Sequence, residues 1–179
     1  EHFIFLEYFI IEEGHMFHQI EDILEKKVKE GVEVRLIYDD VGCIGTLPPR
    51  YYKQLQKKGI KCAAFNPFRP LLSVIMNNRD HRKILVIDGK VAYTGGMNVA
   101  DYYIKGTKQV GSWHDMHCRI EGDEVNTLQK IFLRMWKLVS GEDVHGAKYY
   151  RGISNADYME GLKPDTTPTC GQQMVGIIN

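Results

Sequence analysis

Residues 81–98 read H-R-K-I-L-V-I-D-G-K-V-A-Y-T-G-G-M-N, and they carry the strongest local signals for both fold and chemistry. Two short runs rich in β-branched residues, 83–87 and 91–94, flank Asp88-Gly89, a dipeptide typical of the tight turn in a β-hairpin. His81 and Lys83 are two positions apart, so on a strand both side chains would point to the same face. The sequence therefore predicts a hairpin that begins with an imidazole and an ammonium group side by side.

On both sides of this hairpin, strand patterns alternate with helix patterns. Helical spacing of apolar residues predicts helices over 16–29, 50–58 and 125–139, the first two followed by glycine. Apolar or alternating runs predict further strands over 2–11, 32–38, 60–65 and 116–120. Alternating strands and helices that give way to a hairpin indicate an α/β fold, with a mixed β-sheet flanked by helices.

The 179 residues are enough for one domain and some additional chain. The composition changes after Gly141, and residues 154–173 are polar, with several Gly, Pro and Thr residues. We expect a domain over 1–141 and a linker over 142–179, whose apolar end at 174–178 resembles the opening strand of a missing second half. The chain opens directly on an apolar run without an initiator Met, so we interpret it as a piece of a longer protein.

Charge argues against a nucleic-acid partner. Lys plus Arg and Asp plus Glu are 23 each, which gives no overall basic field. No apolar run approaches the roughly 18 residues that a membrane span requires. His114, His117 and Cys118 have the residue types of a metal site, but on a strand the two histidines point to opposite faces, so no metal site is expected.

The hairpin and the residues after it suit phosphodiester chemistry, which needs a nucleophile, a stabiliser of negative charge and a proton donor. His81 offers a neutral imidazole as the nucleophile, and Lys83 offers a cation for phosphate oxygens. Asn98 adds a neutral donor, and Gly95 and Gly96 would let backbone N–H groups approach a phosphate. The alternative is a strand that carries this histidine and lysine by chance, next to an ordinary turn.

The stretch resembles the phospholipase D superfamily, whose members carry the signature H-x-K-x4-D, matched here by His81, Lys83 and Asp88. The resemblance covers residues 3–139 and is most specific to the amino-terminal half of bacterial cardiolipin synthases. The segments that carry it are Leu6–Ile10, Gly31–Arg35, Tyr38-Asp39, Gly59-Ile60, Phe65–Pro67, Asn78–Lys83, Val86–Gly89, Tyr93–Asn98 and Trp113–Asp115.

The resemblance implies a role for each matching residue. His81 would be the active-site histidine, as nucleophile or as general acid–base, Lys83 and Asn98 would bind phosphate, and Asp88 would support the site. Asp115 resembles the carboxylate that orients a catalytic histidine, often one from the opposite half. Two positions depart from the pattern, since Asp80 stands where Asn is expected and Gly96 where many relatives have Ser. The charge of Asp80 is expected to raise the pKa of His81.

Members of this superfamily use two motifs and a phosphohistidine intermediate, without a cofactor or metal. The resemblance thus implies that this chain is the first-motif half of a phosphatidyltransferase, which forms cardiolipin from two phosphatidylglycerol molecules. Its partner would be a second motif-bearing half, or a second copy of this domain, at the membrane surface of a bacterial cell, and the fragment itself would be soluble.

Two other functions stay open: a homodimeric phosphodiesterase or nuclease, and a non-catalytic scaffold. Residues 68–72, just before the motif, are either a packed loop or a lip that touches the lipid surface.

Overall fold

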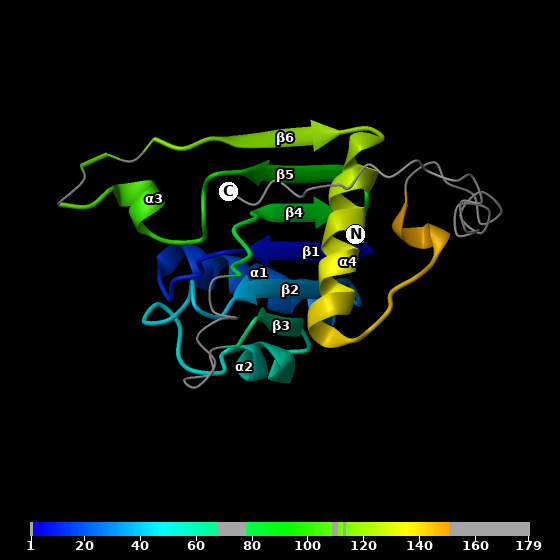
Figure 1. Cartoon of the computed structure of the whole chain (residues 1–179), viewed down its shortest axis with the longest axis horizontal. Helices are drawn as coiled ribbons and strands as arrows, with labels where there is room; N and C mark the ends of the chain where they lie inside the picture. Colours follow the sequence, from blue (N-terminus) through cyan, green and yellow to red (C-terminus); the bar gives the residue numbers. More distant parts are fainter. Residues whose placement is uncertain (1, 68–77, 109–110, 113, 151–179) are drawn as a thin grey trace.

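The computed structural model describes residues 2–67, 78–108, 111–112 and 114–150. Within these ranges the chain forms a six-stranded sheet in the order β3-β2-β1-β4-β5-β6 (Figure 1). The strands are β1 Phe3–Tyr8, β2 Glu33–Asp39, β3 Lys61–Phe65, β4 Ile84–Ile87, β5 Val91–Gly95 and β6 His117–Glu121. The helices are α1 His15–Lys29, α2 Tyr52–Lys57, α3 Tyr102–Lys105, α4 Glu124–Ser140 and the 3₁₀ turn η2 Ala147–Tyr149.

The sheet is mixed. Strands β1, β2 and β3 are parallel, whereas β4 runs antiparallel to β1, and β5 and β6 continue antiparallel. Helices connect the parallel strands, as the parallel arrangement requires. The predicted α/β fold with a mixed sheet flanked by helices is therefore confirmed.

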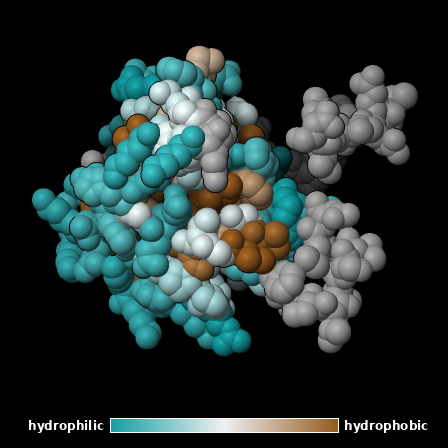
Figure 2. Space-filling view, turned by 90° about the vertical axis from the view of Figure 1, so that its left-hand side faces the viewer, coloured by the Kyte–Doolittle hydropathy of each residue, from teal (hydrophilic) through white to brown (hydrophobic). Residues whose placement is uncertain are grey.

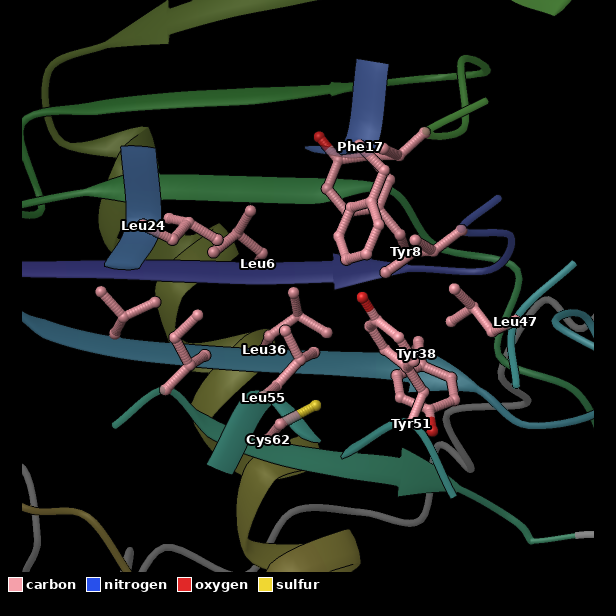
Figure 3. Packing of buried hydrophobic residues seen from close by; sticks show 14 of the residues in the cluster. Leu6, Tyr8, Phe17, Leu24, Leu36, Tyr38, Leu47, Tyr51, Leu55 and Cys62 are labelled. Carbon is pink, nitrogen blue, oxygen red and sulfur yellow. The ribbon is translucent and has the colours of Figure 1, made fainter. Parts of the chain in front are cut away.

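Two cores lie on the two faces of the sheet, because successive strand residues point to opposite sides. On one face, Leu6 of β1 and Leu36 of β2 pack with Phe17 and Leu24 of α1 (Figure 3). On the other face, Phe5 stacks on Phe132 of α4, which crosses the strands near the start of β1 (Figure 1). The first core belongs to α1 and α2, and the second to α4.

The β4–β5 turn forms as predicted. Asp88 and Gly89 have φ angles of +55° and +61°, the left-handed conformation that such a two-residue turn needs. Asp88 Oδ1 accepts the backbone N–H groups of His2, at 2.6 Å, and Phe3, at 2.9 Å. These hydrogen bonds lower the pKa of Asp88 although burial opposes them. The turn thereby fastens the beginning of β1 to the hairpin.

One expectation about the strands was wrong, and one short helix was missed. Strand β4 begins at Ile84, which pairs with Glu7 and Thr94, so His81 and Lys83 lie in the segment before the strand and not on it. The single turn of α3 was not predicted, because four residues are too few to show helical periodicity.

Packing continues beyond Gly141, where the sequence suggested that the domain ends. Glu142 accepts two hydrogen bonds from the buried guanidinium of Arg35, at 2.6 and 2.9 Å. Tyr149 is 4% exposed and lies edge-on to Phe3, with ring centroids 5.3 Å apart. The described packing therefore extends to the residues around Tyr149.

The predicted apolar lip at 68–72 and the polar and apolar parts of the expected linker at 154–178 lie outside the described residues. Within the part of the chain that the structure describes, no helix combines the length and apolarity needed to cross a membrane.

Candidate active site

His81 and Lys83 are in contact. The Lys83 ammonium nitrogen lies 3.0 Å from Nδ1 and 3.2 Å from Nε2 of the His81 ring, and 2.7 Å from the His81 carbonyl oxygen. The His81 side chain is exposed, whereas Lys83 is 2% exposed. An ammonium group can donate only to a ring nitrogen that lacks a proton, so this contact requires a neutral imidazole. The structure thus brings the two predicted groups together.

Electrostatics favour the same protonation state. Removal of part of the ring from water lowers the pKa of His81, and the charge of Lys83 lowers it further. Asp80 and Asp39 act in the opposite direction, so the predicted sign of the Asp80 effect is right but burial and Lys83 outweigh it. Burial also lowers the pKa of Lys83, while Asp115 and Asp80 raise it. At neutral pH the imidazole is in its nucleophilic form.

Phe9, the residue after β1, packs against His81 and Lys83. The Phe9 ring lies 4.7 Å from the His81 ring and 5.4 Å from the Lys83 ammonium nitrogen, centroid distances that allow aromatic and cation–π contacts. The face of the molecule at this end of the sheet has hydrophobic residues at its centre, surrounded by hydrophilic ones (Figure 2). His81 and Lys83 therefore pack against an apolar ring.

Asn98 is tied to the same end of β1. Its Oδ1 accepts the N–H of Ile10 at 3.0 Å, and its Nδ2 donates to the Tyr103 hydroxyl at 2.9 Å. The side chain is 4% exposed. Since a carboxamide nitrogen carries two N–H groups, one remains for a ligand after the bond to Tyr103. Tyr103 on α3 was missed by sequence reasoning, because nothing in the local pattern links it to Asn98.

Gly95 and Gly96 have a steric role that sequence reasoning did not predict, and their predicted contact with phosphate stays a prediction. A side chain at Gly95 would collide with the Met116 carbonyl oxygen, and one at Gly96 would collide with the Asp115 carboxylate. The N–H of Gly96 donates to Met116 O at 3.1 Å, so the protein itself uses this group. The two glycines let the start of β6 and Asp115 approach the end of β5.

Asp115 and Asp88 lie in different places. Asp115 accepts the N–H of Met116 at 2.7 Å, and its charge raises the pKa values of both Lys83 and His117. Asp88 is at the opposite end of β4 from His81, where it binds the backbone of the first strand. The structure therefore brings Asp115 into the electrostatic field of Lys83 but does not bring Asp88 to the site.

A buried carboxyl group behind the site was also missed. Glu7 is 0% exposed, and the Arg82 Nε atom lies 2.7 Å from its Oε1 and 2.8 Å from Asp80 Oδ1. Burial raises the pKa of Glu7 to about 9, and the charge and hydrogen bond of Asp80 contribute to this rise. Glu7 is therefore a neutral acid at pH 7 that donates a hydrogen bond to Asp80.

Asp39, at the end of β2, completes this cluster. Its Oδ2 accepts the N–H of Asp80 at 2.9 Å, and its Oδ1 accepts Arg79 Nη1 at 3.1 Å and the N–H of Gly42 at 2.8 Å. With one neutral acid, the carboxylates of Asp39 and Asp80 face the guanidinium groups of Arg79 and Arg82. The segment that carries the histidine and lysine is thus fixed on its buried side by a charge-balanced cluster.

Comparison with known proteins places this geometry in a family. The family model described as "Cardiolipin synthase, PLD-like domain" matches residues 3–136, well over half of the chain. The chain is 42% identical over 150 residues to a cardiolipin synthase of Alkalihalophilus pseudofirmus, covering 83% of this chain and 30% of that protein. It is 50% identical over 149 residues to a Streptococcus mutans protein without an assigned function, covering 83% of this chain and 32% of that one.

Among solved structures, NucT from Helicobacter pylori superposes with a TM-score of 0.54 at 12% identity, covering 82% of this chain and 83% of that one. This likeness concerns the fold. The chain spans about a third of the length of the curated relatives that it matches.

Proposed function

The chain belongs to the cardiolipin synthase family of phospholipase D-like domains, and from this premise we propose that it is the first-motif half of a phosphatidyltransferase. The reaction joins two phosphatidylglycerol molecules into cardiolipin and releases glycerol. The observation that carries the proposal is the contact between the neutral His81 imidazole and the buried Lys83 ammonium group.

His81 is the nucleophile in this proposal. Its unprotonated ring nitrogen attacks phosphorus, a P–N bond forms, and the bond from phosphorus to the glycerol oxygen breaks. A second imidazole gives a proton to the leaving oxygen and then takes the proton from the hydroxyl group of the second phosphatidylglycerol. This hydroxyl oxygen attacks phosphorus, so a P–O bond forms, the P–N bond breaks and His81 is free again. Lys83 neutralises charge on the non-bridging oxygens throughout, and Asn98 donates to the same phosphate.

The second imidazole comes from a second motif-bearing half or from a second copy of this domain. The chain covers only about a third of its relatives, which supports the first source. Because phosphatidylglycerol is a membrane lipid, the reaction takes place at the surface of the bacterial cell membrane. We infer no metal in the chemistry, since imidazole and ammonium groups supply the nucleophile and the charge.

The test uses the full-length protein that contains this chain, incubated with phosphatidylglycerol vesicles in EDTA. We expect cardiolipin and glycerol in equal amounts. We expect no product from His81→Ala, and full activity from His114→Ala, an exposed histidine that serves as the matched control. Activity that survives in His81→Ala, or disappears on chelation, would refute the proposal. Cleavage of single-stranded DNA by the chain alone would favour the homodimeric phosphodiesterase or nuclease instead.

A further inference from the structure

A cavity of about 200 Å³ lies on the face of the sheet that packs against α1. Leu85 of β4, Tyr93 of β5 and Met16 and Ile20 of α1 line it, together with His117 of β6. Its volume is below the roughly 300–1,000 Å³ of pockets that hold whole drug-sized ligands, so it suits a part of a substrate. Its lining is mainly apolar, and its polar side chains include the His117 imidazole and the Asn98 carboxamide.

Two observations place this cavity beside the candidate site. Asn98, whose side chain is held by the N–H of Ile10 and by Tyr103, also lines the cavity. The Lys83 charge acts on the His117 ring. Gly95 of β5, which pairs with His117 of β6, contributes no side chain between them.

The His117 imidazole has no hydrogen-bond partner among the described residues, although both of its ring nitrogens are buried. Buried polar groups in proteins are nearly always paired, so a partner beyond the described residues is indicated, and a bound ligand can supply it. The charged groups that act on this ring are Asp115 and Lys83. Burial lowers the pKa of His117, and of the two charges Asp115 raises it and Lys83 lowers it, so the ring is neutral at pH 7 with one donor and one acceptor.

A ligand in this cavity has to contact the apolar lining and also form a hydrogen bond with the His117 ring. A hydrocarbon chain would fill the apolar space but leave both ring nitrogens unpaired. An alcohol with a short carbon chain places C–H groups against the walls, and its hydroxyl group can donate or accept a hydrogen bond. If its phosphate is bound at Lys83 and Asn98, the far end of a three-carbon alcohol can enter the cavity and reach His117.

We propose that His117 binds a non-reacting hydroxyl group of the alcohol that is esterified to the phosphate, in the cavity beside Lys83. The inference rests on the proposed phosphatidyl transfer and adds to it a binding site for the alcohol. It makes His117 a determinant of alcohol specificity, selecting a polyol such as glycerol over an alcohol with a single hydroxyl group.

The test compares two acceptor alcohols in the full-length protein. Isotope-labelled glycerol gives labelled phosphatidylglycerol, whereas ethanol gives phosphatidylethanol and has no hydroxyl group beyond the reacting one. His117→Phe keeps a ring in the cavity but loses the hydrogen bond, His117→Gln keeps a donor and an acceptor, and His114→Ala is the control. We expect the glycerol-to-ethanol ratio of kcat/KM to fall roughly fivefold in His117→Phe, to recover in part in His117→Gln, and to stay unchanged in His114→Ala.

An unchanged ratio in His117→Phe, or an equal fall for both alcohols, would overturn this inference and leave the proposed function standing. A wild-type protein that makes neither product would instead refute the proposed function, and the inference with it.

A binding measurement on this chain covers the case in which the variants do not fold. We expect ¹⁵N imidazole signals of His117 to shift on addition of glycerol 3-phosphate and to remain in place with ethyl phosphate, which has no free alcohol. Equal responses to the two phosphates, or a His117 ring that stays insensitive to both and binds only water, would contradict the proposal.

Discussion

The charged side chains on the two sides of the segment before β4 differ in their partners. On the side that faces Glu7 and Asp39, Asp80 and Arg82 belong to a cluster in which each charge meets its opposite. On the other side, Lys83 is almost fully buried, and its described contacts are the His81 ring and carbonyl oxygen and the Phe9 ring. The comparison teaches that ion pairs hold this segment in place, while Lys83 contacts no carboxylate among the described residues. In the function that we propose, its charge meets the phosphate of the substrate.

The largest effect is expected from a substitution of Lys83. Lys83→Met should lower cardiolipin synthesis by the full-length protein roughly 10²–10³-fold, because a cation aimed at developing negative charge is lost. Its stability to urea should stay equal or rise, since a buried ammonium without a carboxylate in contact is costly. Lys90→Met, at an exposed position, is the control. A large loss of stability in Lys83→Met would show that Lys83 stabilises the fold and would contradict this prediction.

A substitution in the cluster of paired charges should mainly lower the stability of the fold. Arg82→Met leaves the Asp80 carboxylate without its cation, so we expect a loss of roughly 2 kcal/mol in the free energy of unfolding of this chain. This is below the ~3–5 kcal/mol typical of breaking a buried pair, because Arg82 is partly exposed. Urea denaturation measures it, with Arg119→Met as a surface control. Equal stabilities of the two variants would contradict a structural role for the cluster.

The protonation of Glu7 makes the free energy of unfolding depend on pH. Its pKa is raised from 4.5 to about 9 in the folded chain, so the folded state binds a proton that the unfolded state releases between these values. Its contribution is fully present below pH 4.5 and is lost as the pH rises to 9, by at most about 1.4 kcal/mol for each pH unit. Glu7→Gln, whose amide donates to Asp80 at every pH, should therefore show a flatter decline in stability between pH 6 and pH 8.

Unfolding free energies of the wild type, Glu7→Gln and the surface variant Glu30→Gln at pH 6, 7 and 8 test this difference. We expect Glu30→Gln to follow the wild type, because a group whose pKa is lowered in the folded state acts only at lower pH. Parallel curves for the wild type and Glu7→Gln would show that Glu7 is ionised in the folded chain.

The smallest effect is expected at Gly96, where Asp115, just before β6, comes close to the end of β5. Gly96→Ala has to displace the Asp115 carboxylate, so activity of the full-length protein should fall roughly tenfold through misplacement of that charge. If the glycine serves only to admit Asp115, the double variant Gly96→Ala/Asp115→Ala should be no less active than Asp115→Ala alone. Additive losses would assign Gly96 a separate role, such as an N–H group for phosphate.

The sequence predicted the parts of this picture that depend on neighbouring residues. The Asp88-Gly89 turn and the alternation of strands and helices are local patterns, and the structure confirms both. The pairing of His81 with Lys83 was also predicted, although the reason given was wrong, because the two residues precede β4.

The missed features depend on contacts between distant segments. Glu7 reads as one more residue of an apolar strand until β1 pairs with β4 and brings Arg82 against it. His117 was considered only as a metal ligand, since its place beside Asn98 in one cavity depends on the pairing of β5 with β6. Likewise, the clash that explains Gly96 involves Asp115, which no local pattern connects to it.

The pKa of the His81 imidazole in this chain, followed by ¹⁵N NMR in the wild type and in Lys83→Met, tests the central claim most directly. The account predicts a value below the ordinary 6.5 in the wild type and a higher value in the variant, because the neighbouring ammonium charge contributes to the depression. A wild-type value at or above 6.5, or one that Lys83→Met leaves unchanged, would contradict a neutral imidazole poised beside a cation.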